Sequence, residues 1–140
     1  MNIDEMMLEQ LRVAIAGRLG YRYYWYDGLG ECYLRDLGIQ NTGAMTTLTR
    51  RPDDYPVNME FVPNWPADIA AADALLDDLE SRSGHWELAS LSGGGYQLAV
   101  IIDTPAEIRA FRAMGKTRPE AICRAWLKAT AAQTMEDQGG

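Results

Sequence analysis

The residues best suited to chemistry in this sequence are cations near the start of the last predicted helix. Arg118 directly precedes that helix, and Arg124 and Lys128 lie within it, one turn apart. A helix start presents free backbone N–H groups and a guanidinium binds phosphate through paired donors, so together they are typical of a phosphate site. Arg50 and Arg51 form a second basic pair. The alternative is that all these cations are solvated charges that balance an acidic surface.

Aromatic side chains supply the other half of a possible binding site. They are more numerous than one face of a small sheet needs: Tyr24, Tyr26, Tyr33, Trp65 and Tyr96. Aromatic rings stack on nucleobases, although filling a core or a subunit interface is the commoner use. The predicted ligand-binding set combines these rings with the cations and one amide: Arg118, Arg124, Asn64, Trp65, Tyr96 and Tyr24.

The sequence contains none of the usual catalytic or metal-binding signatures. HExxH, GxSxG, Walker A and paired-cysteine motifs are absent, and His85 is the single histidine. Cys32 and Cys123 are far apart, which favours two reduced, packed thiols. Carboxylates cluster at 53–54 and 73–80, and the second cluster has the spacing of a solvated helix face. We therefore predict neither a metal, nor a cofactor, nor catalysis; a metal-dependent hydrolase is the third and weakest hypothesis.

Charge and hydropathy restrict the partners. The 140 residues carry a formal net charge of −7, and such a surface repels DNA and RNA, so non-specific nucleic-acid binding is not expected. A small anionic ligand held by a few arginines is a different electrostatic problem and stays possible. No apolar run approaches the length of a membrane span, and the acidic opening MNIDEMMLEQL does not resemble a secretory signal. We expect a cytoplasmic protein that does not bind membranes.

The elements that must position these residues can be read from periodicity and capping signals. A first helix is expected over 2–19, ended by Gly20, and an aromatic hairpin over 21–35. Residues 36–56 show no sustained period and are expected to be irregular, with a short strand over 58–62.

The second half of the chain has clearer signals. A helix over 66–82 is expected to begin at Pro66, with Asp68 in its first turn and Ile69, Ala72, Leu75, Leu76 and Leu79 on its inner face. Strands at 85–91 and 96–102 flank a glycine turn. Thr104-Pro105-Ala106-Glu107 has the form of a capping box and predicts a short helix to Gly115. Thr117-Arg118-Pro119-Glu120 repeats this capping chemistry and is expected to open the last helix, which runs to about Ala132.

This order predicts an α+β fold: one antiparallel sheet of about four or five strands packed with helices. One domain is expected over 1–134, with a disordered tail at 135–140.

Three stretches resemble the phage ABA sandwich domain family of tailed-phage and prophage proteins. They are the opening helix followed by GYRYYWYDG, the block VPNWPADIAAADALLDDL, and the closing TRPEAICRAWLKA. Family members typically have a loop with proline, asparagine and an aromatic, then Thr/Ala-Asp-Ile-Ala-Ala-Ala, and end in Ala-Ile-Cys-(Arg/Leu)-Ala-X-Leu. Here Trp65-Pro66 replaces the usual aromatic-Ser/Thr pair, and the stretch 36–56 is extended. The resemblance implies a three-layer α/β/α sandwich.

A further similarity, to phage anti-Thoeris proteins, implies a function. Such proteins are oligomeric and sequester a cyclic ADP-ribose-type signal, with arginines on its phosphates and aromatics on adenine. In this sequence Arg118 and Arg124 would take the phosphate role. We therefore expect a phage-encoded, homo-oligomeric, non-enzymatic protein that sequesters a cyclic ADP-ribose-type or cyclic nucleotide immune signal in the infected bacterial cell and so blocks anti-phage defence. The alternative is a small structural or partner-binding phage protein without a small-molecule ligand.

Overall fold

A computed structural model describes residues 2–26, 30–35, 45–47, 59 and 62–139. The chain forms two compact units, one built from 1–12 with 64–140 and the other from 13–63. The fold class is α+β, and three helices pack on a three-stranded antiparallel sheet. None of the described helices combines the length and apolar character needed to cross a membrane. The single domain expected over 1–134 stays a prediction.

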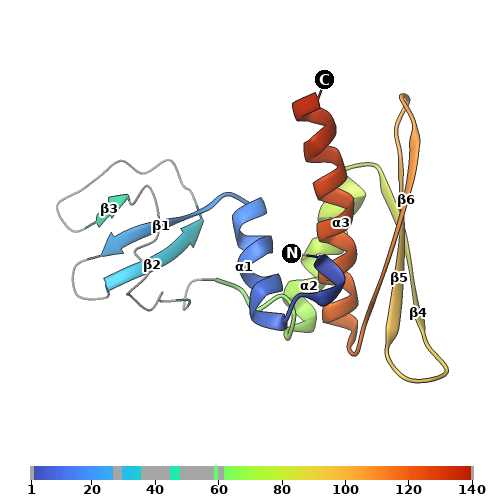
Figure 1. Cartoon of the computed structure of the whole chain (residues 1–140), viewed down its shortest axis with the longest axis horizontal. Helices are drawn as coiled ribbons and strands as arrows, with labels where there is room; N and C mark the ends of the chain where they lie inside the picture. Colours follow the sequence, from blue (N-terminus) through green and yellow to red (C-terminus); the bar gives the residue numbers. More distant parts are fainter. Residues whose placement is uncertain (1, 27–29, 36–44, 48–58, 60–61, 140) are drawn as a thin grey trace. The chain divides into compact units, whose positions relative to one another are not determined.

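The first unit is built on an antiparallel sheet in the order β4-β5-β6 (Figure 1). Its strands are β4 (Gly84–Ser90), β5 (Tyr96–Asp103) and β6 (Ile108–Gly115). Alternate residues of the central strand are buried: Leu98, Val100 and Ile102. Successive side chains of a strand point to opposite faces, so these three define an inner face that packs on the helices.

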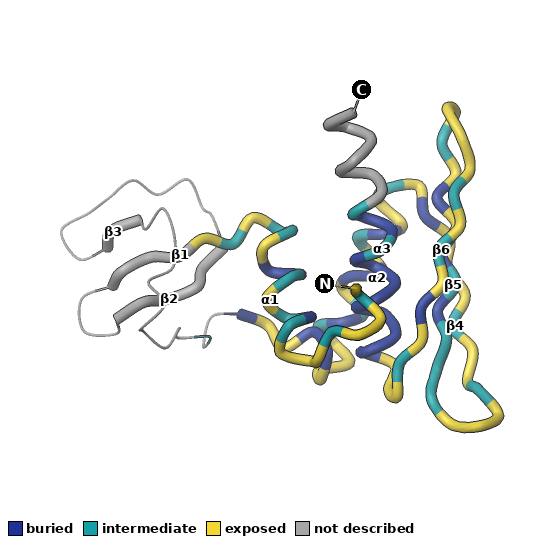
Figure 2. The backbone as a smooth tube through the Cα atoms, in the orientation of Figure 1, coloured by how far each residue is buried: buried dark blue, intermediate teal, exposed yellow. Residues whose placement is uncertain are grey.

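The helices among the described residues are the 3₁₀ turn η1 (Ile3–Glu5), α1 (Leu8–Arg18), α2 (Ile69–Ser81) and α3 (Arg118–Gly139). Two of them, α2 and α3, lie against the inner face of this sheet, and η1 contacts α3. Helix α3 packs on β5 and β6, and α2 packs on α3 and β4. Figure 2 shows the buried residues of α2, α3 and β5 where helices and sheet meet. The core is closed by Leu75, Leu76 and Leu79 of α2 and by Ile122, Trp126 and Leu127 of α3.

The sheet differs from the expected one. Instead of one sheet of four or five strands there are two three-stranded sheets in the described residues, because the aromatic hairpin pairs with a third strand of its own. The second face of β4-β5-β6 carries exposed side chains such as Ile101 and Met114. The described helices therefore supply one helical layer to this sheet and not the two of a three-layer sandwich.

Residues 104–115, predicted to be a capping box and a short helix, form a tight turn and strand β6. Thr104 N–H donates to the Glu107 carbonyl at 3.0 Å, and the Thr104 hydroxyl accepts from Glu107 N–H at 3.3 Å. The capping-box residues thus close a hairpin turn, because the residues that follow, 108–115, pair along the whole of β5, and their exposure alternates between the two faces of the sheet.

Helix α2 confirms most of its predicted stripe but begins later than expected. Asp68 is the N-cap rather than a first-turn residue, and its carboxylate accepts from Ala70 and Ala71 N–H at 2.9 and 3.3 Å. Ala72 and the three leucines are buried as predicted, whereas Ile69 is 54% exposed.

The predicted first helix is split at Met6. The Asn2 side chain caps η1 by accepting from Asp4 N–H at 3.0 Å, and Met6 then has extended dihedrals before α1 begins at Leu8. Gly20, with φ of +91°, follows the end of α1 as expected. At the other end of the chain, α3 continues to Gly139, past the predicted end near Ala132.

The second unit contains the predicted aromatic hairpin. Strands β1 (Tyr21–Tyr26) and β2 (Gly30–Arg35) are antiparallel, in register from Tyr21 opposite Arg35 to Tyr26 opposite Gly30. A third strand, β3 (Met45–Thr47), pairs with β1 and lies in the stretch expected to be irregular. Of the short strand expected at 58–62, residues 59 and 62 are described, and both lie outside strands.

Candidate functional site

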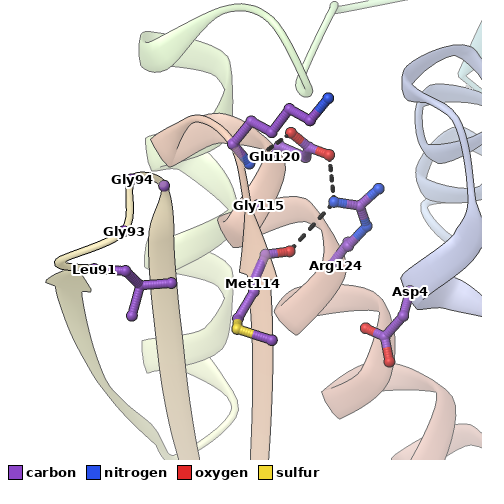
Figure 3. Close-up of a pocket in the computed structure, with 10 residues that line it drawn as sticks. Asp4, Leu91, Gly93, Gly94, Met114, Gly115, Glu120 and Arg124 are labelled. Atoms are coloured by element: carbon purple, nitrogen blue, oxygen red, sulfur yellow. Dashed lines mark hydrogen bonds and ion pairs between the residues drawn. The ribbon is translucent and has the colours of Figure 1, made fainter.

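A pocket of about 650 Å³ lies where the β4–β5 turn, the end of β6 and the start of α3 meet (Figure 3). All of its lining residues belong to the first unit. They are Asp4, Leu91, Gly93, Gly94, Gly95, Met114, Gly115, Lys116, Glu120 and Arg124. The volume is within the range of small-molecule sites, roughly 300–1,000 Å³.

Glycines form one wall of the pocket because the backbone there is crowded and unusually turned. Gly94 and Gly95 have φ of +98° and +91°, which glycine adopts without a steric penalty. A Cβ on Gly95 would lie 2.8 Å from the Gly115 carbonyl oxygen, and a Cβ on Gly115 would lie 2.5 Å from Ala121 N. Gly93 has neither constraint. The triple glycine thus brings bare backbone to the pocket and fits closely against the β6–α3 corner.

Arg124 lies in the pocket wall but is held in place by other parts of the chain. Its residue is 9% exposed, and it forms an ion pair with Glu120. Its guanidinium also donates to three backbone carbonyls, those of Ile3 (3.3 Å), Met6 (2.8 Å) and Met114 (3.2 Å). Figure 3 shows the guanidinium between Glu120 and the Met114 carbonyl. Arg124 therefore acts as a structural clamp that holds η1, β6 and α3 together.

The start of α3 satisfies most of its own donors. Thr117 accepts from Glu120 N–H at 3.3 Å through its hydroxyl and from Ala121 N–H at 3.1 Å through its carbonyl. The Glu120 carboxylate accepts from Lys116 N–H at 2.9 Å, and Pro119 has no N–H. A ligand at this helix start would therefore meet few free N–H groups, and its attraction would depend on side-chain cations.

Lys116 is the pocket cation for which the described chain shows no side-chain partner. Asp4, across the pocket, pairs with Lys128 at 2.8 Å. Because Asp4 and Arg124 are each paired with an opposite charge, Lys116 is the group left to attract an anion.

The structure separates the six predicted ligand-binding residues. Arg124 is the one that lines the pocket, while Arg118 is exposed at the helix start and Tyr96 is half-buried at the start of β5. Trp65 is only 4% exposed and belongs to the core.

Asn64 lies in the turn before α2, and Tyr24 lies in the other unit. The Asn64 side chain is exposed, and its carbonyl accepts from Ala67 and Asp68 N–H at 3.0 and 2.8 Å. Tyr24 pairs with Cys32 and Thr47 across the second sheet. The roles proposed for these six residues stay predictions, and the described chain does not bring them to one cavity.

Sequence reasoning did not select three residues that shape the pocket: Gly95, Gly115 and Lys116. The sequence predicts only a turn at the triple glycine, and the closeness of this turn to α3 depends on β6 being a strand. The position of Lys116 directly before the Thr117 cap was a usable signal.

The carboxylates of α2 do not converge on a cavity. Asp78, expected on the solvated face, accepts from Trp126 Nε1 at 2.7 Å and from Arg82 Nε at 2.8 Å. Glu80 accepts from Trp86 Nε1 at 3.1 Å, while Asp77 is exposed. Across the described ranges no three His, Cys, Asp or Glu side chains are grouped to hold a metal ion. Asp78 therefore links α2 to α3, and Glu80 links α2 to β4.

Comparison of the chain with protein-family models, with curated proteins and with solved structures gives no significant match. The resemblance to the phage ABA sandwich domain family and to anti-Thoeris proteins therefore stays a prediction from the residues quoted above.

Proposed function

We propose that the protein is a phage-encoded, non-enzymatic binding protein that sequesters a small anionic nucleotide, a cyclic ADP-ribose-type or cyclic nucleotide immune signal. It would act in the cytoplasm of the infected bacterial cell and block anti-phage defence. The family resemblance motivates the proposal, which does not depend on the three-layer arrangement that the family name implies. Sequestration requires only a dissociation constant below the signal concentration.

The observation that carries the proposal is the pocket beside the triple glycine. Its volume of about 650 Å³ suits a nucleotide-sized molecule. Bare glycine backbone allows phosphate oxygens to approach closely, and Lys116 supplies a positive charge. Its lining residues include no Ser, Thr, Cys or His, so the wall offers none of the common nucleophile–base pairs. Binding without chemistry is the function that this lining supports best.

The test is to incubate the protein with cyclic ADP-ribose isomers and cyclic oligonucleotides, remove free ligand, heat the complex and analyse what is released. Intact ligand supports sequestration. Altered ligand would contradict a non-enzymatic role, and failure of every ligand in this set to bind would reject the proposal.

Three variants locate the site. Gly93→Trp should block binding without strain, since a Cβ on Gly93 has open space and its φ is ordinary. Lys116→Glu should weaken binding by about tenfold or more through charge reversal. Arg118→Ala distinguishes this pocket from the phosphate role predicted from the sequence: it removes a neighbouring exposed cation that does not line the pocket, so binding in the pocket should be unchanged. Loss of binding only in Arg118→Ala would move the site to the outside of the helix start.

A second function, partner binding without a small-molecule ligand, is favoured by a different observation. The face of β4-β5-β6 turned away from the helices exposes Ile101 (46%), Ile108 (69%) and Met114 (58%). Exposed apolar residues that share one face of a sheet are typical of protein interaction sites. Ligand binding that is absent throughout the set, with stable self-association or partner binding, would support this second function.

A further inference from the structure

The outer face of the sheet β4-β5-β6 is defined by register and exposure. It consists of His85, Glu87 and Ala89 on β4, Gln97, Ala99, Ile101 and Asp103 on β5, and Ile108, Ala110, Arg112 and Met114 on β6. Directly paired residues share a face, and the buried Leu98, Val100 and Ile102 lie on the opposite one. Exposed residues occur along all three strands (Figure 2).

The centre of this outer face is apolar and hollow. Small side chains at Ala99 and Ala110 leave a groove of about 380 Å³ between β5 and β6, next to Ile101. The half-exposed Ile101 projects from the face, and the groove at Ala99 and Ala110 can receive a side chain of a partner. Such shape complementarity is what a packed interface needs.

One row across the outer face carries opposite charges at its two ends. Glu87 pairs in register with Ala99, and Ala99 pairs with Arg112. The described chain gives neither charged side chain a partner; only the backbone carbonyl of Arg112 is used, accepting from Lys128 at 2.9 Å. An acid on one outer strand and a base on the other, level with each other, form a self-complementary pattern.

We propose that the outer face is a homodimer interface in which two copies pack sheet against sheet about a two-fold axis parallel to β5. This symmetry places β4 of each copy over β6 of its partner. Because Glu87 and Arg112 occupy the same row, each Glu87 then meets the partner's Arg112, and the contact forms twice. Ile101 packs against its own symmetry mate at the centre, beside the alanine grooves.

Charge also selects this axis over the other face-to-face arrangement. A two-fold axis in the plane of the sheets but perpendicular to the strands would place β4 over β4 and β6 over β6. If that axis passed near the row of Glu87, Ala99 and Arg112, Glu87 would face the partner's Glu87 and Arg112 the partner's Arg112, and both contacts would be repulsive. Asp103 lies on β5 and would face its own symmetry mate across the proposed axis. It is exposed at the end of the face beside the β5–β6 turn, where water and salt screen this pair.

The area predicts a dimer of moderate affinity. With strands of seven or eight residues, a rise of about 3.4 Å and a spacing of about 4.8 Å give a face of roughly 27 by 14 Å. Two such faces, corrugated by side chains, bury about 1,000 Å², the lower end for specific interfaces. The dimer should therefore dissociate on dilution. The Glu87–Arg112 contacts involve no residue that lines the pocket, so failure of the dimer and failure of the proposed function are separate results.

Sedimentation velocity over about a hundredfold range of concentration tests the proposal. The wild-type chain should form a reversible dimer, whereas Glu87→Arg and Arg112→Glu should each weaken dimerisation at least about tenfold. Mixing the two single variants should restore a dimer, because in the mixed pair both contacts join opposite charges. The double variant, with both reversals in one chain, should also dimerise.

Two controls make every outcome decisive. Asp77→Arg reverses an exposed charge on α2, away from the outer face, and should leave dimerisation unchanged. Circular dichroism confirms that each variant is folded. A wild-type chain that stays monomeric would overturn the proposal. A wild-type dimer that survives both single reversals, or folded variants that fail to re-form a dimer on mixing, would overturn it equally.

Discussion

Arg124 shows at the scale of one residue how the same chemistry can hold a fold together or bind a ligand. A guanidinium near a helix start suits phosphate, but here it is buried against Glu120 and three carbonyls. Bringing a phosphate to it would require breaking contacts inside the fold. Its main contribution is therefore to stability, and the exposed Lys116 is the better cation for an anion in the pocket.

Arg124→Ala should destabilise the protein by about 3–5 kcal/mol, because it leaves the Glu120 carboxylate buried without its partner. Urea unfolding followed by circular dichroism measures the loss. Arg118→Ala, a turn and a half earlier and exposed, should change stability by less than about 0.5 kcal/mol. Equal effects of the two substitutions would contradict the clamp assignment.

Cys123 is a second residue whose chemistry is set by burial. Loss of solvation raises the pKa of the thiol far above its usual range; neighbouring Arg124 lowers it and Glu120 raises it, both to a smaller extent. In the native protein the thiolate is therefore scarce at pH 8, and we expect iodoacetamide to leave Cys123 unmodified until urea unfolds the chain. Peptide mass spectrometry identifies the modified cysteine, and rapid native alkylation at Cys123 would disprove the assignment.

The same pKa shift predicts how stability depends on pH. Below the unfolded thiol pKa, about 8.5, both states hold the proton and stability is unaffected. Above it the unfolded state loses the proton first, so stability should fall by up to about 1.4 kcal/mol per pH unit until the raised folded pKa is reached. Urea unfolding at pH 7.5 and 9.5 should show this loss in the wild-type chain and less of it in Cys123→Ala.

At the scale of elements, the end of α2 contains a strained residue. Ser83 has φ of +66°, the left-handed region that favours glycine, while its N–H donates to the Glu80 carbonyl at 3.2 Å. The next residue, Gly84, has no room for a side chain, since a Cβ there would lie 2.6 Å from the Leu79 carbonyl oxygen. The turn from α2 into β4 therefore concentrates its strain on one serine.

Ser83→Gly should stabilise the protein by roughly 0.5–1 kcal/mol, because glycine adopts positive φ without a Cβ clash. Thermal unfolding detects this as a higher midpoint. Ser81→Gly, two residues earlier and still helical, should have the opposite sign for the same chemical change.

Substitutions on the two faces of strand β5 should lower the free energy of unfolding by different amounts. Leu98→Ala should cost about 2.5–5 kcal/mol, because Leu98 is fully buried against the helices. Ile101→Ala, three residues later on the outer face and 46% exposed, should cost less than about 1 kcal/mol in the dissociated chain while weakening dimerisation. Unfolding at low concentration separates the two effects.

Elements with a strong local signal were predictable from the sequence. The α2 stripe, the aromatic hairpin and the strands on either side of the triple glycine follow from periodicity alone. The segment 104–115 was not predictable in this way, because Thr-Pro-Ala-Glu satisfies a local capping pattern in either structure. Pairing with β5 decides it, and that pairing is non-local.

The candidate site was less predictable than the fold, for the same reason. The pocket exists because β6 returns the chain to the triple glycine, so a helix at 108–115 would have removed it. Arg124 was selected for its chemistry alone, since no sequence pattern reveals that Ile3 and Met6 would occupy its donors.

At the scale of the whole molecule, the net charge determines whether the protein binds nucleic acids. With a net charge of −7 and its described arginines partly consumed by ion pairs, we expect no binding to duplex DNA or RNA even at low salt. Electrophoretic mobility shift over rising protein concentration measures this. A shift that disappears as salt is added would show a local basic surface that outweighs the net charge.

The Arg124 clamp also has a consequence for when the protein can fold during synthesis. It joins residues separated by 118 and 121 positions, and Lys128 reaches Asp4 across 124. At about 5–20 residues per second, the ribosome synthesises η1 roughly 6–25 s before the part of α3 that contacts it. During that interval the strands and α2 are made before their covering helix, with apolar surface open to chaperones and to other nascent chains.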